Sequence, residues 1–174
     1  NTTIDLLVKH GAKSGDEDSI VVAFDVENIN AFKEHLINGA DPNLKIAYWD
    51  GDEVTLLSYV LSSYYYYNSY DKLYDTEYVE LLLSYGADLN VFDYDGYTCL
   101  MRAIENKNIE FIELFIDNGA DINAKNIRGE TALHCAARWF FDDQKKYLEL
   151  LLSKGADVNA IITTGPDRGH TPLD

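Results

Sequence analysis

Apolar residues recur at helical spacing in several short segments, and each of these segments ends at a glycine. Residues three and four positions apart share one face of an α-helix, so this spacing is typical of a helix with one buried side. The pattern therefore predicts short amphipathic helices, each followed by a turn. Two such sets of apolar residues are Ile29, Phe32, Leu36 and Ile109, Ile112, Ile116.

The string Gly-Ala-Asp-x-Asn follows these segments four times. Its copies occupy residues 39–43, 86–90, 119–123 and 155–159, and a degraded copy begins at Gly11. Counted from the degraded copy, the intervals between successive glycines are 28, 47, 33 and 36 residues. Gly enters the left-handed conformation at little cost, and Asp and Asn bond their own backbone in tight turns. Each copy therefore predicts the end of a helix and a turn.

A second string begins eight residues after two of these turns. It reads TCLMRA over residues 98–103 and TALHCA over residues 131–136. Thr98 and Thr131 are suited to cap a first helix, and the small alanines allow helices to approach closely. The two strings in fixed register, with one interval of 33 residues, closely resemble the ankyrin repeat. This resemblance covers essentially the whole chain.

The resemblance implies an all-α fold, an ankyrin-repeat solenoid of stacked helix-turn-helix units with projecting β-hairpin loops. We expect residues 1–174 to form a single array, and both ends look like cuts through a longer array because neither carries a polar capping repeat. The expected units are 1–15 (partial), 16–43, 44–90, 91–123, 124–159 and 160–174 (partial).

The resemblance also implies where a partner binds, on a concave face formed by hairpin tips and first helices. Tyr, Trp and Arg are enriched in binding hot spots, which favours Arg138 and Trp139. The alternative for Trp139 is that it fills core space created by an insertion before the second helix. In register, the candidate partner-binding residues are Tyr94, Asp95, Tyr97, Glu105, Ile127, Arg128, Glu130, Arg138 and Trp139.

Two loops, from Asn43 to Thr55 and from Asn159 to Thr171, are four residues longer than the pattern expects. Insertions in repeat proteins often lie on the binding face. The first loop contains Tyr48 and Trp49, which are either a second partner-binding anchor or local packing; the sequence leaves both interpretations open.

A third insertion, of about ten residues, separates the two helices of unit 44–90 and is rich in tyrosine over residues 64–70. Tyrosine gives large contact area at small entropic cost, as in antibody binding loops. However, Tyr67, Tyr70, Tyr74 and Tyr78 are spaced three and four residues apart, which is a helical stripe. We favour packing over binding for this stripe.

Charge narrows the class of partner. The formal net charge is −16, and it is uneven: residues 1–100 carry 18 acids and 5 bases (net −13), whereas residues 101–174 carry 12 acids and 9 bases (net −3). Nucleic-acid binding needs clustered Lys and Arg, so this balance argues against it. A protein with a basic surface suits the acidic half, although the charge could also serve only solubility.

No apolar segment approaches the roughly 20 residues of a membrane span, and the chain starts without a secretory signal, so we expect a cytoplasmic protein. Cys99 and Cys135 are expected to be reduced core thiols. His134 stands where the resemblance implies a structural histidine that bonds turn backbone. The other histidines share no motif, and we expect no catalytic residue, metal, cofactor or small-molecule substrate.

These patterns favour a protein-binding ankyrin scaffold or adaptor over an enzyme. The alternative is an acidic inhibitor or immunity protein that blocks a basic enzyme such as a nuclease. A third reading places a catalytic domain outside residues 1–174.

Overall fold

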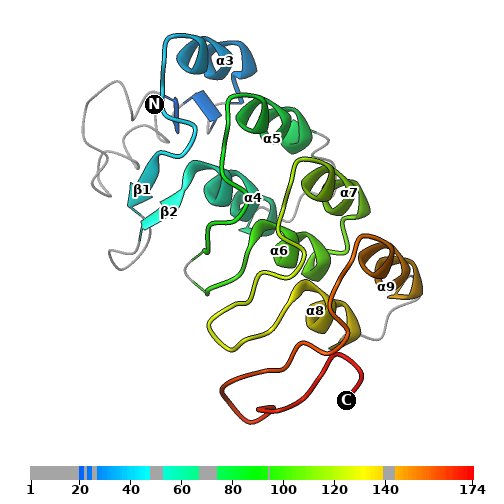
Figure 1. Ribbon diagram of the computed structural model, residues 1–174. Coiled ribbons are helices and arrows are strands. Elements are labelled where there is room, and N and C mark those ends of the chain that lie inside the picture. The colour runs from blue at the N-terminus through cyan, green and yellow to red at the C-terminus, as the bar shows by residue number, and fades with distance from the viewer. Residues whose placement is uncertain are drawn as a thin grey trace. The chain divides into compact units, whose positions relative to one another are not determined.

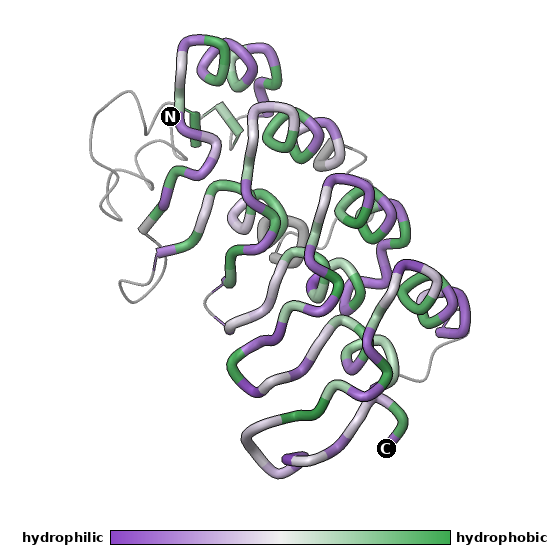
Figure 2. Tube along the Cα trace, in the orientation of Figure 1, coloured by the Kyte–Doolittle hydropathy of each residue, from purple (hydrophilic) through white to green (hydrophobic). Residues whose placement is uncertain are grey.

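A computed structural model of the chain describes residues 20–21, 23–24, 27–47, 53–66, 74–93, 95–138 and 144–174. It divides into two compact units, unit 1 (Asn1–Asp88) and unit 2 (Leu89–Asp174). Figure 1 shows that the described part is mostly helical, with helices joined in pairs by turns. Figure 2 shows hydrophobic and hydrophilic residues alternating around these helices, as the sequence pattern predicts.

Unit 1 contains a β-hairpin and several helices, and described residues 20–21 and 23–24 are also helical. Its helices include α3 (Ile29–Ile37), α4 (Leu56–Tyr66) and α5 (Tyr74–Ser84). Strands β1 (Lys45–Ala47) and β2 (Glu53–Thr55) pair antiparallel, with Ile46 opposite Val54. The hairpin leads directly into α4, where the Thr55 hydroxyl accepts a hydrogen bond from the Ser58 N–H at 3.2 Å.

An aromatic cluster lies within the buried core of unit 1. The ring of Tyr78 in α5 meets the rings of Phe24 and Phe32 edge to face, at centroid distances of 5.0 and 4.9 Å. Such pairs contribute about 0.5–1.5 kcal/mol each beyond area burial. Tyr78 is buried, so packing is confirmed for this member of the tyrosine stripe. Tyr67 and Tyr70 lie outside the described residues.

Unit 2 consists of two helix pairs. Helices α6 (Cys99–Glu105) and α7 (Ile109–Asp117) form the first pair, and α8 (Ala132–Arg138) and α9 (Gln144–Ser153) form the second. The two first helices, α6 and α8, contact each other. The Thr98 hydroxyl caps α6 as predicted, accepting from the Met101 N–H at 3.3 Å. The predicted stripe on α7 is only partly right, because its buried residues are Phe111, Ile112 and Phe115.

Each Gly-Ala-Asp-x-Asn string forms the predicted turn, and in the first three copies the Asn side chain also bonds the backbone of the next turn. In unit 2, the Asn123 side chain accepts from the Asp157 N–H at 2.8 Å and donates to the Gly155 carbonyl at 3.1 Å. In unit 1, Asn43 makes the same two bonds, to Asp88 and Gly86. We call these connections the asparagine ladder. It fixes the register of successive turns within each unit through side-chain to backbone bonds.

The predicted projecting β-hairpins form in one place only among the described residues, at β1 and β2. The corresponding segments of unit 2, residues 93–97 and 126–130, are tight turns instead. Each is closed by a backbone bond of 2.9 Å between its first N–H and its last carbonyl. The side chains of Asp93 and Asn126 supply further bonds inside these turns, so no strand ladder is needed.

Candidate protein-binding surface

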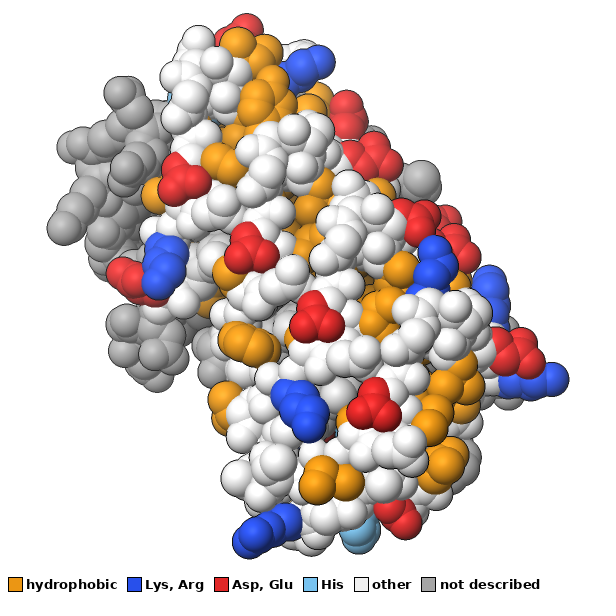
Figure 3. Space-filling view, in the orientation of Figure 1, with side chains coloured by type: hydrophobic (Ala, Val, Ile, Leu, Met, Phe, Trp, Pro, Cys, Tyr) orange, Lys and Arg blue, Asp and Glu red, His pale blue; other side chains and the backbone are white. Residues whose placement is uncertain are grey.

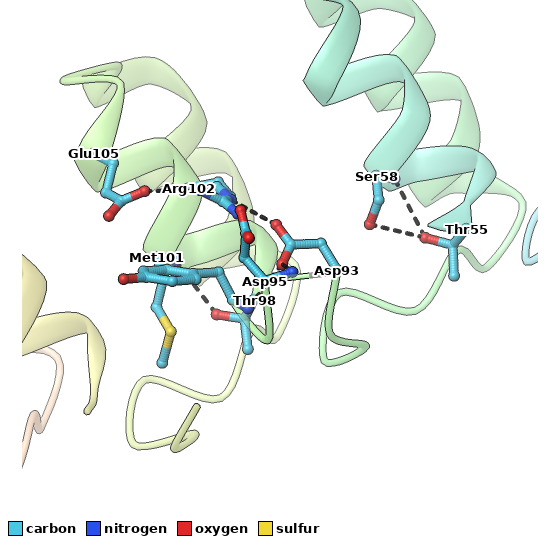
Figure 4. Close-up of polar contacts among 9 residues, drawn as sticks. Thr55, Ser58, Asp93, Asp95, Thr98, Met101, Arg102 and Glu105 are labelled. Carbon is cyan, nitrogen blue, oxygen red and sulfur yellow. Dashed lines mark hydrogen bonds and ion pairs between the residues drawn. The ribbon is translucent and has the colours of Figure 1, made fainter. Parts of the chain in front are cut away.

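Turn 93–97 and helix α6 are joined by an ion-pair network centred on Arg102. Its guanidinium contacts Asp93 at 2.5 Å, Glu105 at 3.0 Å, and Asp95. Figure 4 shows the two aspartates approaching from the turn and Glu105 from the same helix. The guanidinium also lies 4.5 Å above the centre of the Tyr97 ring. Arg102 therefore fixes the turn against the helix.

Electrostatics favour the charged form of Arg102. Burial alone would lower the pKa of this side chain, but the hydrogen bond and negative charge of Asp93 outweigh burial and raise it. Three carboxylates share one guanidinium here, which leaves a local net charge of −2. The network therefore joins the turn to the helix and keeps an excess of negative charge.

Turn 126–130 and helix α8 are joined in a similar way, by Arg138. Its guanidinium contacts the carboxylate of Glu130, whose side chain is only 1% exposed. The Asn126 amide donates to the same carboxylate at 2.7 Å. Burial opposes the charged form of Arg138, but hydrogen bonding with Tyr97 and the charge of Glu130 raise its pKa. Arg138 thus connects the second turn to the Tyr97 of the first.

Loop 160–170, one of the two insertions, packs against turn 126–130. The Arg128 carbonyl accepts hydrogen bonds from the Thr163 N–H at 2.8 Å and from the Thr163 hydroxyl at 3.2 Å. Gly129 has a φ of +85°, and a Cβ added there would lie 2.8 Å from the Thr163 nitrogen. Only glycine fits this contact without displacement. The insertion therefore packs against turn 126–130 and stabilises it.

We define the turn surface of unit 2 by four exposed residues and the half-buried Glu105: Asp95, Glu105, Ile127, Arg128 and Arg138. Phe92 and Lys125, which directly precede the two turns, are also exposed. Ile127 is 76% exposed, although it is the only strongly apolar member. Its side chain lies over Gly96, where an added Cβ would be 2.9 Å from it. On the side shown in Figure 3, apolar and basic side chains lie next to one another over the last turns of unit 2.

His134 plays a structural part beneath this surface, as predicted. Its Nδ1 accepts a hydrogen bond from the Thr131 N–H at 3.1 Å, so the neutral ring carries its proton on Nε2. Burial lowers the pKa of His134, against the opposing effect of the His170 backbone. The histidine is therefore neutral near pH 7, and its hydrogen bond with the Thr131 N–H stabilises the start of α8.

Other chemistry is sparse in the described part of the chain. Cys99 and Cys135 are buried free thiols, and burial raises the pKa of Cys135 to about 12, which makes it a poor nucleophile. Among the described residues, no group of three or more His, Cys, Asp or Glu side chains is arranged to hold a metal ion. In the part of the chain that the structure describes, every helix is too short or too polar to span a lipid bilayer.

A family model for ankyrin repeats, in three copies, matches residues 19–126 and again residues 71–162. The chain belongs to the ankyrin repeat family. A comparison with curated proteins finds no match. Ankyrin repeats are general protein-interaction modules and are typically not enzymes, so the family indicates binding as the function of this fold.

The structure of this ankyrin chain separates the predicted binding residues into three groups. Asp95, Glu105, Ile127, Arg128 and Arg138 lie on the turn surface. Tyr97 and Glu130 were expected on the projecting hairpins but are buried, because they are the partners of Arg102 and Arg138. The remaining four lie outside the described residues: Tyr48, Trp49, Tyr94 and Trp139.

Sequence reasoning missed Arg102, which organises the first turn. A local signal was present, because Arg102 and Glu105 are three residues apart on one helix and two aspartates precede that helix closely. Thr131 also differs from expectation. It was expected to cap α8, but its N–H and its hydroxyl both lie within hydrogen-bond distance of His134 Nδ1, the hydroxyl at 3.0 Å.

Proposed function

We propose that this ankyrin chain is a protein-binding scaffold or adaptor that holds its partner on the turn surface of unit 2. The observation that carries the proposal is Ile127, a large apolar side chain exposed to solvent on a surface where ion pairs hold Asp95 and Arg138. Preorganised side chains lose little conformational entropy on binding, so more of the contact energy appears as affinity. In protein interfaces, a few central residues carry most of the binding energy, and the contacts around them exclude water.

Site-specific photocrosslinking tests this proposal. A benzoylphenylalanine placed at position 127 of the full chain is expected to form a discrete covalent adduct with a protein in extracts of the source cells. The matched control carries the same group at Glu113, which is exposed on α7, a second helix. Equal adducts from both positions, or none from position 127, would contradict the proposal.

The acidic inhibitor remains a second candidate because residues 1–100 carry a net charge of −13. A basic partner attracted by that charge would associate faster at low ionic strength, since long-range attraction is screened by salt. The association rate of the captured partner is therefore to be measured between about 20 and 500 mM salt, a range over which the Debye length falls several-fold. A rate that does not change with salt removes this candidate.

A further inference from the structure

Three turns of unit 2 contact one another in a fixed order. The side chain of Ile127 lies over Gly96 of the first turn, and the Arg128 carbonyl accepts from Thr163 of the insertion loop. Turn 126–130 therefore lies between turn 93–97 and the insertion loop. We call these three contacting segments the turn row.

The two ends of this row carry opposite charge. At the first turn, Asp95 has a side chain that is 47% exposed, within a network whose net charge is −2. At the far end, Arg128 on turn 126–130 and Arg168 on the insertion loop are exposed, and the exposed Asp167 stands beside Arg168, so the net charge of these three residues is +1. The Arg168 N–H donates to the Gly165 carbonyl at 3.3 Å, and an added Cβ at Gly165 would lie 3.9 Å from Arg128 Cδ.

Ile127 lies between these ends and faces solvent. The row thus offers an acidic site, an apolar site and a basic site in sequence. An extended peptide crosses such a row with a rise of about 3.3 Å per residue and presents different side chains to each site. A folded partner with a uniformly basic surface would be repelled by the arginine end.

Building on the proposed function, we infer that the turn row recognises a linear segment of the partner with a basic residue at one end, an apolar residue in the middle and an acidic residue at the other end. The basic residue pairs with Asp95 and its network, the apolar residue packs against Ile127, and the acidic residue pairs with Arg128. Charge order sets the direction in which the segment lies. Complementary charges at both ends also exclude segments of a single charge.

Selection from a random dodecapeptide library displayed on phage tests the inference with the full chain as bait. We expect enrichment of sequences with a basic, an apolar and an acidic position in that order or its reverse. A synthetic peptide of the enriched sequence is then measured by fluorescence polarisation. Ile127→Asp is expected to weaken its binding at least ten-fold, whereas the matched control Ile37→Asp, at an exposed isoleucine of unit 1, leaves it unchanged.

Charge exchange provides the second arm. Arg128→Glu is expected to weaken binding about five-fold, and replacing the acidic residue of the peptide by Lys is expected to restore it. Enriched peptides that bind Ile127→Asp normally, or that carry one sign of charge only, overturn the inference. So does a failure to enrich any pattern. If position 127 still captures a protein by photocrosslinking in those cases, the proposed function stands and only the linear-segment inference fails.

Discussion

Replacing Glu130 tests whether its buried carboxylate holds the second turn of unit 2. Glu130→Met keeps a similar side-chain volume but removes the acceptor used by Arg138 and by the Asn126 amide. The variant therefore leaves a guanidinium and a buried amide without that partner. Unit 2 is expected to lose stability, and turn 126–130 to loosen.

The size of the loss follows from the exposure of the two partners. Breaking a fully buried ion pair costs about 3–5 kcal/mol. The Arg138 side chain is 36% exposed, so water can solvate part of its charge once Glu130 is gone, and the expected cost falls to about 2–3 kcal/mol. In the double variant Glu130→Met/Arg138→Met no stranded charge remains, and we expect recovery of about 1 kcal/mol or more.

Urea unfolding followed by circular dichroism measures this effect as the change in unfolding free energy at constant m. Glu113→Met, at an exposed position of α7, is the matched control and is expected to change stability by less than about 0.5 kcal/mol. If Glu130→Met is no less stable than Glu113→Met, the carboxylate does not hold the turn and the reasoning is refuted.

Three further changes test other contacts of unit 2. Gly129→Ala is expected to lose about 2–4 kcal/mol in urea unfolding, because its Cβ meets Thr163 and its φ is positive; Gly155→Ala, with open space around it, is expected to lose only about 1 kcal/mol. His134 has a lowered pKa in the fold, so the unfolded chain takes up its proton first. The unfolding free energy is therefore expected to fall as pH drops below about 6.5, and to fall less in His134→Gln; equal pH profiles would contradict this. Asn123→Ala removes two bonds of the asparagine ladder and is expected to cost about 1–2 kcal/mol, a loss visible as faster hydrogen exchange at the Asp157 amide; unchanged exchange there would count against the ladder.

Local signals in the sequence predicted the helices and turns well. The Gly-Ala-Asp-x-Asn string marks the ends of helices because the conformation of glycine and the bonding of Asp are properties of a few adjacent residues. Thr98 capped α6 for the same reason. Helical periodicity was less reliable in detail, since Ile109 and Ile116 are only partly buried while Phe111 and Phe115 are fully buried.

Burial of individual polar residues could not be predicted in the same way. Glu130 looks like a surface residue in the sequence, and it becomes buried because Arg138, eight residues later, and Asn126 both bond its carboxylate. Tyr97 is covered because Arg102 lies over its ring. Such contacts depend on how helix and turn meet in three dimensions, which no short pattern records. The sequence could therefore locate the candidate surface. It could not distinguish the residues exposed on that surface from buried residues such as Glu130 and Tyr97, which stabilise it.

The asparagine ladder also bears on how this protein tolerates changes in length. Its bonds join residues 45, 31 and 34 positions apart, from Asn43 to Asp88, Asn90 to Asp121 and Asn123 to Asp157. The same turn-to-turn connection thus forms across three different separations. Mutation can lengthen the segment between two paired helices while the repeats on either side keep their alignment. For protein engineering, the segment between α4 and α5 is accordingly a suitable place to insert a reporter domain.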